Sequence, residues 1–481
     1  MPPRPTSRRP GPAVRLLVLG LLGSLLLGCS RDDAVLGPDR TGTADQNGSD
    51  TTTTDGKAGG GKKDDDDKQG DDKKDDDGEK QDDDPSRKAC PDPEALAPAE
   101  VEVEPLIEGD GDEPSVSAVV YPHPEHEGQP WSQWGQGIAP SAGRFLSAIG
   151  DSCGVNGNAY LYAYDAADGT LRLTTDVLSL VDHQDGAWGF GKVHGPIVPG
   201  PEDDLYAMTY WGSHDGLEYG DGYEGDLLLR IDPDTGEATS LGVPLPGYGT
   251  PSLAASPEHG LLYGEAVDPT TSEPKTGVFF VYDVEAGEVT FTVEKGETKG
   301  YRSILVDADG RALFSTEDGL LRYDPDTGEA TDPDLDLPGE YLRAASAPGP
   351  DGTVYGVTRE PDVLFALHPD GEVDELGPVR GYTASLALAP DGDTLYYVPD
   401  AHGVAWEEGT PVIAVDTRTG AETVLVELND AAERGLDLRL GGSYDIVMDP
   451  SGDRLYVGLN AGPLDSDDGF GEVVLAVIEL P

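Results

Sequence analysis

Two histidines and one carboxylate are the residues whose types could support catalysis. His194, His214 and Glu265 lie in or beside segments that lack a regular strand pattern. An imidazole next to a carboxylate, with a Tyr nearby, can remove a proton from a substrate or help to hold a divalent cation. A single His in a loop is more often an ordinary surface residue. These three residues are therefore a hypothesis for a catalytic or metal site, and they leave open whether the chain is an enzyme.

A second set of residues is suited to binding. Short segments built around a Tyr recur along the chain, as in Gly300-Tyr301-Arg302-Ser303 and Glu340-Tyr341-Leu342-Arg343. Tyr rings with a few charged neighbours would form an amphipathic pocket floor for a sugar or another polar, ring-bearing ligand. Each Tyr could equally be a wedge that packs neighbouring structural units. The candidate ligand-binding residues are Trp211, Tyr219, Tyr223, Tyr248, Tyr301, Arg302, Arg343, Tyr382, Tyr444 and Asp445.

A repeated phrase indicates which elements would position these residues. Leu228–Thr239 and Leu320–Thr331 both read Leu-Leu-Arg, then Ile or Tyr, then Asp-Pro-Asp-Thr-Gly-Glu-Ala-Thr. Each copy is an apolar strand, a tight turn and a second strand, because the Asp side chain folds back on the backbone and the Gly takes a positive φ. The Asp residues also resemble a calcium loop in spacing, but they lack the downstream ligands. Hairpins that recur about every 40–50 residues are typical of a propeller.

The repeats predict an all-β fold with seven four-stranded antiparallel blades over residues 130–481. Turns of the Pro-Asp-Gly type precede strands that end in Leu-Tyr or Val-Tyr, and an apolar third strand follows each of them. In such blades the first-to-second and third-to-fourth turns share one face, here called the turn face. The second-to-third loops and the inter-blade segments share the other, here called the loop face. The long, unusual loops belong to the loop face, so we expect the site there.

The seventh blade ends after its third strand, since the chain stops at Pro481. We expect its outer strand to come from residues 89–129, which precede the first blade. Val101–Ile107 could supply this strand, and Ser115–Val120 is the competing donor. Either would remove an exposed sheet edge. His123 and His126 in the same segment offer a weak metal-binding pattern.

Some blades carry a family resemblance. Leu395-Tyr396-Tyr397-Val398, Leu455–Asn460 and Val412–Gly420 resemble the repeats of bacterial YVTN/quinoprotein-type seven-bladed propellers. The resemblance covers residues 130–481 and implies the fold. It implies no single function, because this architecture is found in lyases, lactonases, dehydrogenases and binding proteins.

The first 28 residues have the pattern of a lipoprotein signal peptide. Basic residues precede an apolar segment, Leu16–Gly28, that is too short to span a bilayer, and Leu26-Leu27-Gly28-Cys29 resembles the bacterial lipobox. The resemblance implies that Cys29 is lipidated, which would attach an exported chain to the membrane of the cell envelope. An ordinary secretory signal is the alternative.

Residues 29–88 form a low-complexity acidic segment with almost no apolar residues, so we expect a disordered tether. The formal net charge of the chain is -61. This charge argues against nucleic acid as a partner. An acidic tail that binds a partner or a divalent cation is the alternative interpretation of the tether.

Cys90 and Cys153 remain if Cys29 is lipidated. In an oxidising compartment such a pair indicates a disulfide between the segment before the first blade and that blade. Two free thiols or half of a metal site are the alternatives.

Three functions fit these observations. The chain could bind a ligand, such as a polysaccharide, or an envelope protein on the loop face. It could be an exported carbohydrate lyase or lactonase that uses His194, His214 and Glu265. It could also be a scaffold whose ring only organises other envelope proteins and has no small-molecule pocket, which a channel plugged by side chains would favour.

Overall fold

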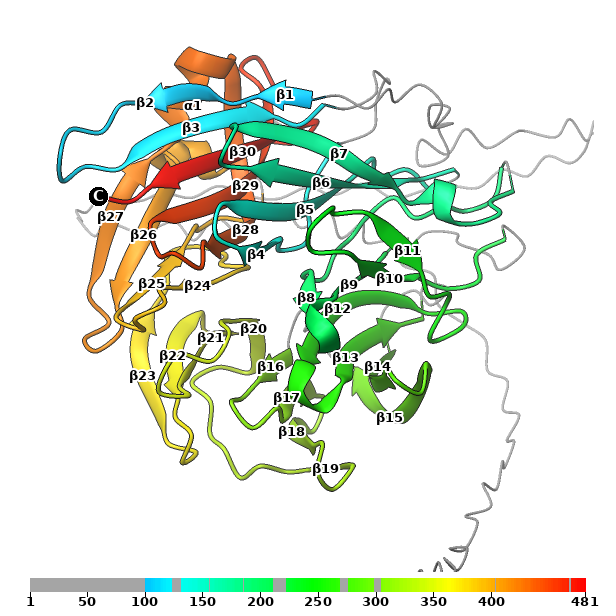
Figure 1. Cartoon of the computed structure of the whole chain (residues 1–481). Coiled ribbons are helices and arrows are strands. Elements are labelled where there is room, and N and C mark those ends of the chain that lie inside the picture. Colours follow the sequence, from blue (N-terminus) through cyan, green and yellow to red (C-terminus); the bar gives the residue numbers. More distant parts are fainter. Residues whose placement is uncertain are drawn as a thin grey trace, which may run out of the picture. The chain divides into compact units, whose positions relative to one another are not determined.

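The computed structural model describes residues 100–122, 131–154, 156–184, 186–210, 222–268, 276–297, 304–402, 404–466 and 469–481. These residues form seven antiparallel β-sheets arranged as the blades of a propeller (Figure 1). All seven predicted third strands are present, so the predicted fold class is confirmed.

From the innermost strand outward, the first blade consists of β4 (Ile138–Ser141), β5 (Arg144–Gly150), β6 (Ala159–Asp165) and β7 (Thr170–Asp176), the second of β8 (Val198–Pro199), β9 (Leu205–Met208), β10 (Leu228–Ile231) and β11 (Ala238–Ser240), and the third of β12 (Gly249–Ser256), β13 (Leu261–Val267), β14 (Thr276–Asp283) and β15 (Glu288–Glu297). The fourth blade consists of β16 (Ile304–Val306), β17 (Ala312–Thr316), β18 (Gly319–Asp324) and β19 (Glu329–Thr331), the fifth of β20 (Tyr341–Ala345), β21 (Val354–Arg359), β22 (Val363–Leu367) and β23 (Val373–Pro378), and the sixth of β24 (Ala387–Leu388), β25 (Thr394–Tyr397), β26 (Pro411–Asp416) and β27 (Glu422–Glu427). The seventh blade contains β28 (Leu438–Met448), β29 (Arg454–Pro463) and β30 (Glu472–Glu479).

The helical elements of the described chain are short. One α-helix, α1 (Asn429–Leu436), precedes the innermost strand of the seventh blade. Short 3-10 helices cover Leu178–Leu180, Pro201–Asp203, Pro257–His259 and Ala405–Glu408. No helix among the described residues is long and apolar enough to cross a membrane.

The seventh blade is completed by the segment that precedes the first blade. β3 (Ser115–Val120) pairs along β30 and supplies the fourth strand, and β2 (Glu104–Ile107) pairs with β3 as a fifth strand. β1 (Glu100–Glu102) pairs instead with β7 of the first blade. Val101–Ile107 therefore does not fill the open edge of β30, and the competing donor does. In β3, Val116, Ala118 and Val119 are buried, which explains why this segment takes the inner position.

Chemically specified turns define the blades. In the third-to-fourth turn of the second blade, the Asp232 carboxylate accepts the backbone N–H groups of Asp234 and Thr235, at 2.9 and 2.7 Å. Gly236 follows with a φ of 76°. Asp324 and Asp416 make the same bonds in their own turns. Turn formation thus accounts for these carboxylates without a calcium ion.

Apolar side chains fill the spaces between neighbouring blades. Phe279 of the third blade stacks on Phe314 of the fourth, with ring centroids 3.8 Å apart. Phe145 of the first blade stacks on Tyr456 of the seventh, with ring centroids 4.8 Å apart, so aromatic packing also joins the first and last blades. Successive side chains of a strand point to opposite faces, and strands such as β6 and β22 are buried on both faces between two neighbouring blades, so the core consists of several inter-blade layers.

Candidate functional site

Trp134 is the centre of an aromatic cluster on the loop face. It precedes β4 in the inter-blade segment 131–137 and is half-buried. Its ring lies 5.2 Å from Tyr444, 5.5 Å from His402, 5.6 Å from Phe470 and 6.1 Å from His194, measured between ring centroids. The indole Nε1 donates a hydrogen bond to Ser132 Oγ at 2.6 Å, which fixes the ring. These rings come from the first, second, sixth and seventh blades.

The cluster continues from His402 to the fifth blade. The His402 ring lies 5.3 Å from both Tyr444 and Tyr382. The guanidinium groups of Arg343 and Arg359 each lie 4.5 Å from the centre of the Tyr382 ring. At the other end, Lys192 Nζ lies 4.2 Å from the centre of the Trp134 ring. A continuous series of contacts therefore runs from Arg343 to His194. We call the residues joined by these contacts the aromatic belt; they are Trp134, Lys192, His194, Arg343, Arg359, Tyr382, His402, Tyr444 and Phe470.

Two members of the aromatic belt are placed by β-bulges. In the fifth blade Leu342 pairs with Thr358 and Ala344 with Val357, so Arg343 is the extra residue of the bulge. In the seventh blade Ser443 pairs with Leu459 and Asp445 with Gly458, so Tyr444 is the extra residue. A bulge changes the direction of a side chain relative to the pleat. This explains how residues of innermost strands come to lie among the loops.

His194 is held by two neighbours. Its Nδ1 donates to the carbonyl oxygen of Pro251 at 2.8 Å, and its ring lies 5.0 Å from that of Tyr210. Because Nδ1 carries the proton of this bond, Nε2 carries the lone pair of the neutral ring. His194 therefore has a fixed ring orientation within the aromatic belt.

Glu265 forms a buried ion pair with a lysine of the same blade. Its carboxylate forms an ion pair with Lys295 Nζ inside the third blade, where Glu265 is 2% and Lys295 1% exposed. Lys295 is itself the extra residue of a bulge, since Gly277 pairs with Gly296 and Val278 with Glu294. Burial lowers the pKa of Lys295 to about 7, and the facing carboxylate opposes this shift. The pair lies within the sheet, and a catalytic function for Glu265 stays a prediction.

Asp445 is buried beneath the aromatic belt. Its carboxylate accepts the backbone N–H of Gly137 at 2.8 Å and the side-chain amide of Gln133. Gln133 also bonds Asn460 in both directions through its backbone N–H and carbonyl groups. Burial raises the pKa of Asp445 to about 7. Through these hydrogen bonds, Asp445 connects the seventh blade to the segment that leads into the first blade.

Tyr223 and Tyr248 lie at the boundary of the second and third blades. Tyr223 Oη donates to the backbone carbonyl of Tyr248 at 3.0 Å. Tyr248 packs against an apolar cluster that includes Val198, Leu253 and Leu262. Among the described residues, neither Tyr contacts the aromatic belt through a ring contact of its own. Their geometry fits the alternative interpretation of Tyr residues as wedges between blades.

Several predicted residues lie outside the described part of the chain. They are Cys29, Cys90, Trp211, His214, Tyr219, Tyr301 and Arg302. Cys153 is described and fully buried. The disulfide between Cys90 and Cys153 and the lipidation of Cys29 therefore stay predictions. In the described segments no group of three or more His, Cys, Asp and Glu side chains is arranged to hold a metal ion.

Sequence reasoning missed five members of the aromatic belt. They are Trp134, Lys192, Arg359, His402 and Phe470. Lys192 stands two residues before His194, and His402 lies in one of the long loops, so position alone could have suggested both. Phe470 lies in the corresponding loop of the seventh blade, between β29 and β30, whereas Trp134 lies in a segment that does not repeat and no local pattern distinguishes it.

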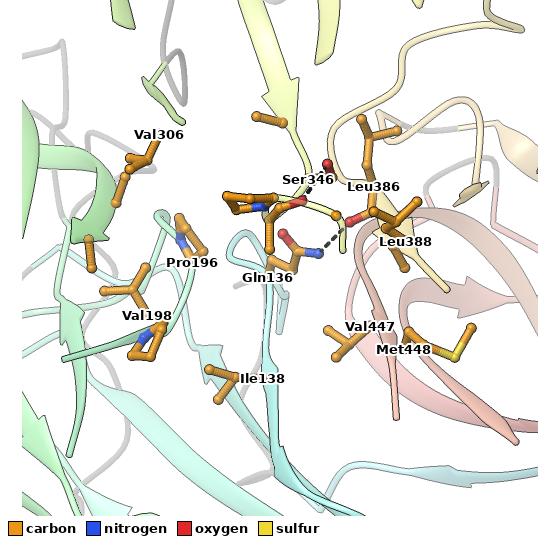
Figure 2. A pocket seen from close by; sticks show the side chains of 18 of the residues that line it. Gln136, Ile138, Pro196, Val198, Val306, Ser346, Leu386, Leu388, Val447 and Met448 are labelled. Carbon is orange, nitrogen blue, oxygen red and sulfur yellow. Dashed lines mark hydrogen bonds between the residues drawn. The ribbon is translucent and has the colours of Figure 1, made fainter. Parts of the chain in front are cut away.

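A cavity of about 850 Å³ lies in the central channel and is lined by the innermost strands of all seven blades (Figure 2). Ile138, Val198, Leu388 and Met448 are among its apolar lining residues. Its lining includes residues of first-to-second turns, such as Glu258 and Asp307, so the cavity occupies the turn-face half of the channel. This cavity and the aromatic belt are thus at opposite ends of the channel. We base the candidate site on the belt, because the belt gathers the cations and rings.

No protein-family model matches the chain, and no curated protein matches it. Several solved structures are distantly similar. An oligogalacturonate lyase from Vibrio parahaemolyticus is 13% identical with a TM-score of 0.47, over 80% of this chain and 99% of that one. A virginiamycin B lyase from Staphylococcus aureus is 9% identical with a TM-score of 0.45, over 75% and 99%. A hydrazine synthase from Kuenenia stuttgartiensis is 15% identical with a TM-score of 0.44, over 74% and 97%. At this distance the similarities carry no argument about binding or activity.

Proposed function

We propose that the chain is an exported lipoprotein whose propeller binds an acidic, ring-bearing ligand, such as an acidic oligosaccharide, on its loop face. The observation that carries the proposal is the aromatic belt with its three cations. Rings of Trp and Tyr offer flat surfaces that pack against sugar rings, and the half-buried Lys192 and Arg359 offer positive charge. Arg359 also pairs with Asp362 at 2.8 Å, and Arg343 is buried beside the same Tyr382 ring. The belt combines both kinds of group within one series of contacts.

The net charge of the chain limits where an acidic ligand could bind. The sequence has 93 Asp and Glu residues against 32 Lys and Arg residues. An acidic surface repels anions in general, so a local group of cations beside exposed rings is the part of the described surface best suited to attract one. His402 at the exposed edge of the belt and the half-buried Trp134, Tyr382 and Phe470 leave ring surface accessible.

Attachment to the cell envelope rests on the sequence. The apolar segment Leu16–Gly28 and the following Cys29 support lipidation, and the acidic residues 30–88 support a tether between the lipid and the propeller. Cys29→Ser should move the protein from the membrane fraction to the soluble fraction of cells. Retention of this variant in the membrane fraction would contradict a lipid anchor on Cys29.

The binding proposal is tested by titrating the full chain with an oligouronate and with its methyl ester, whose esterified carboxyl groups carry no negative charge. We expect saturable binding of the acid at least tenfold tighter than that of the ester. Equal binding of both would support a ring-binding site without selection for charge. Binding of neither would contradict the saccharide as ligand.

A second candidate function is catalysis by a lyase or lactonase at His194. The bond from Nδ1 to the Pro251 carbonyl favours it, because this bond selects the tautomer in which Nε2 is the basic nitrogen of the neutral imidazole. Product formation from an oligouronate or a lactone, measured by mass spectrometry with and without a chelator, tests this function and any need for a divalent cation. Turnover that persists in His194→Ala would contradict it.

A further inference from the structure

The cavity in the central channel differs in chemistry from the aromatic belt. Its wall is built from short segments of the seven innermost strands, and Figure 2 shows Ile138, Val198, Val306, Leu386, Leu388, Val447 and Met448 around it. A cavity of about 850 Å³ is within the size range of small-molecule sites, which are mostly apolar with a few polar groups. The apolar cavity is therefore suited to a different class of ligand from the loop face.

Apart from Glu258, the polar side chains of the wall have hydrogen-bond partners in the wall or next to it. Gln136 Nε2 donates to the carbonyl oxygens of Ile446 and Leu386, at 2.7 and 3.2 Å. Ser346 Oγ donates to the Ala347 carbonyl at 2.8 Å. Ser256 Oγ bonds His259 Nδ1 at 2.8 Å, and Asp307 accepts from Arg311. Side chains of the wall thus offer an incoming molecule mainly apolar surface, which a sugar would not match.

Gln136 also separates the cavity from the loop face. It precedes the innermost strand β4 of the first blade, and its amide reaches the sixth and seventh blades through Leu386 and Ile446. Its side chain therefore links the first blade to the sixth and seventh, and Figure 2 shows it among the residues that line the cavity. The rim of the cavity is formed at the opposite end by the first-to-second turns.

This rim is acidic. Six of the seven first-to-second turns carry net negative charge with His neutral, and the exception is Ser141–Arg144. Glu258 is exposed and lines the cavity directly. Hydrogen bonds from Thr353 lower the pKa of Asp351 on the fifth turn, so its carboxylate stays ionised. An apolar channel that ends in a ring of negative charge matches a molecule with an apolar body and a positive end.

We propose that the turn-face half of the channel binds a cationic amphiphile, with the apolar body inside the channel and a protonated amine at the acidic rim. The apolar body loses contact with water against the side chains of the seven innermost strands. The amine remains at the rim, where it is hydrated and close to Glu258 and the other turn carboxylates. This site is independent of ligand binding on the loop face.

The test compares three probes of one chain length on the full chain by isothermal titration calorimetry below their micelle concentrations. The probes are octylammonium, 1-octanol and octanoate. We expect the affinity to fall in that order, with at least a tenfold difference between octylammonium and octanoate. Addition of an oligouronate should not change octylammonium binding. Equal affinities for octylammonium and octanoate, or no saturable binding of octylammonium, would overturn the proposal.

Two pairs of variants place the site. Ala347 is an exposed residue that lines the cavity, and Ala286 is exposed in a third-to-fourth turn of the same face. Ala347→Trp should weaken octylammonium binding at least tenfold, whereas Ala286→Trp should leave it unchanged. Glu258→Gln should weaken it about threefold, and Glu285→Gln on the outer turn should not. Unchanged binding in Ala347→Trp, with thermal unfolding like that of the wild type, would overturn the assignment to the channel.

Discussion

Lys192 Nζ lies 4.2 Å from the centre of the Trp134 ring. Lys192 stands in the segment that leads into the second blade, and Trp134 in the segment that leads into the first. The contact therefore joins two inter-blade segments on the loop face and places a cation directly beside the central ring of the aromatic belt. In a chain with 93 acidic residues, this arrangement is the basis of the proposed acidic ligand.

Trp134→Ala should weaken the binding of an oligouronate at least tenfold. The indole is the ring that contacts His194, Tyr444, His402 and Phe470, so its removal interrupts the belt. A tenfold loss corresponds to about 1.4 kcal/mol. Trp134→Phe keeps an aromatic ring but loses the hydrogen bond to Ser132, and it should retain most of the affinity. Calorimetry of both variants checks this prediction, and equal affinity of the wild type and Trp134→Ala would contradict it.

Lys192→Gln should reduce the preference for the acid over its methyl ester. A charged group that pairs with a carboxylate contributes about 1.5–3 kcal/mol, so we expect roughly a tenfold loss for the acid. Binding of the ester should change by less than about twofold, because no charge is involved. Titration with both ligands distinguishes two causes. Loss of the cation should weaken mainly the binding of the acid, whereas a general disturbance of the site would weaken the binding of both ligands equally.

Glu265→Gln should destabilise the fold. This change leaves Lys295, which is 1% exposed, without its facing carboxylate, and breaking a buried ion pair costs about 3–5 kcal/mol. The double variant Glu265→Leu with Lys295→Met should recover much of the loss, since both charges are then removed. Differential scanning calorimetry of the single and double variants measures this. An unfolding temperature unchanged in Glu265→Gln, together with lost turnover, would instead favour the catalytic function of Glu265.

Asp445 should make the stability of the fold depend on pH. Burial raises its pKa from 3.8 to about 7, so between these values the folded chain holds a proton that the unfolded chain has released. The free energy of unfolding relative to Asp445→Asn should therefore fall as pH rises from about 4 to about 7 and stay constant above that. Unfolding temperatures of the two proteins across this range test the prediction. A difference that does not change with pH would show that Asp445 does not titrate there.

His194→Asn separates the two functions considered for the loop face. An Asn side chain can keep the donor that bonds the Pro251 carbonyl but lacks the Nε2 lone pair. Under the binding proposal, affinity for an oligouronate should remain within about threefold. Under the catalytic alternative, any turnover should disappear while binding persists. Loss of binding without loss of folding would mean that the imidazole ring itself contacts the ligand.

Local patterns explain why the fold was predictable. The bonds from Asp232 to the N–H groups of Asp234 and Thr235, and the positive φ of Gly236, are set within five residues. Such turns recur in the sequence and define the blades. Closure of the ring was less predictable, because Val101–Ile107 and Ser115–Val120 are both short and apolar. The choice between them depends on packing against β30, which no local pattern encodes.

The site depended on contacts between distant residues. Arg343, Tyr382 and Tyr444 were predicted from the repeated inter-blade segments, and the structure brings them into one belt through His402. Trp134 stands outside the repeats and Phe470 in a loop of the seventh blade, yet their rings stack 5.6 Å apart. Glu265 was predicted as a candidate catalytic residue with His194 and His214, and the structure pairs it with Lys295, 30 residues later in the sequence, within the blade. Burial and pairing of this kind are decided by the tertiary structure.

Footprinting of the loop face tests the central claim most directly. The full chain would be labelled by a carbene reagent with and without a saturating oligouronate, and the labelled peptides would be measured by mass spectrometry. We predict protection of the peptides that carry Trp134, Lys192, Tyr382 and His402, with unchanged labelling of the Pro-Asp-Gly turns on the turn face. Protection of the turns, or labelling that the ligand does not change anywhere on the loop face, would contradict the account.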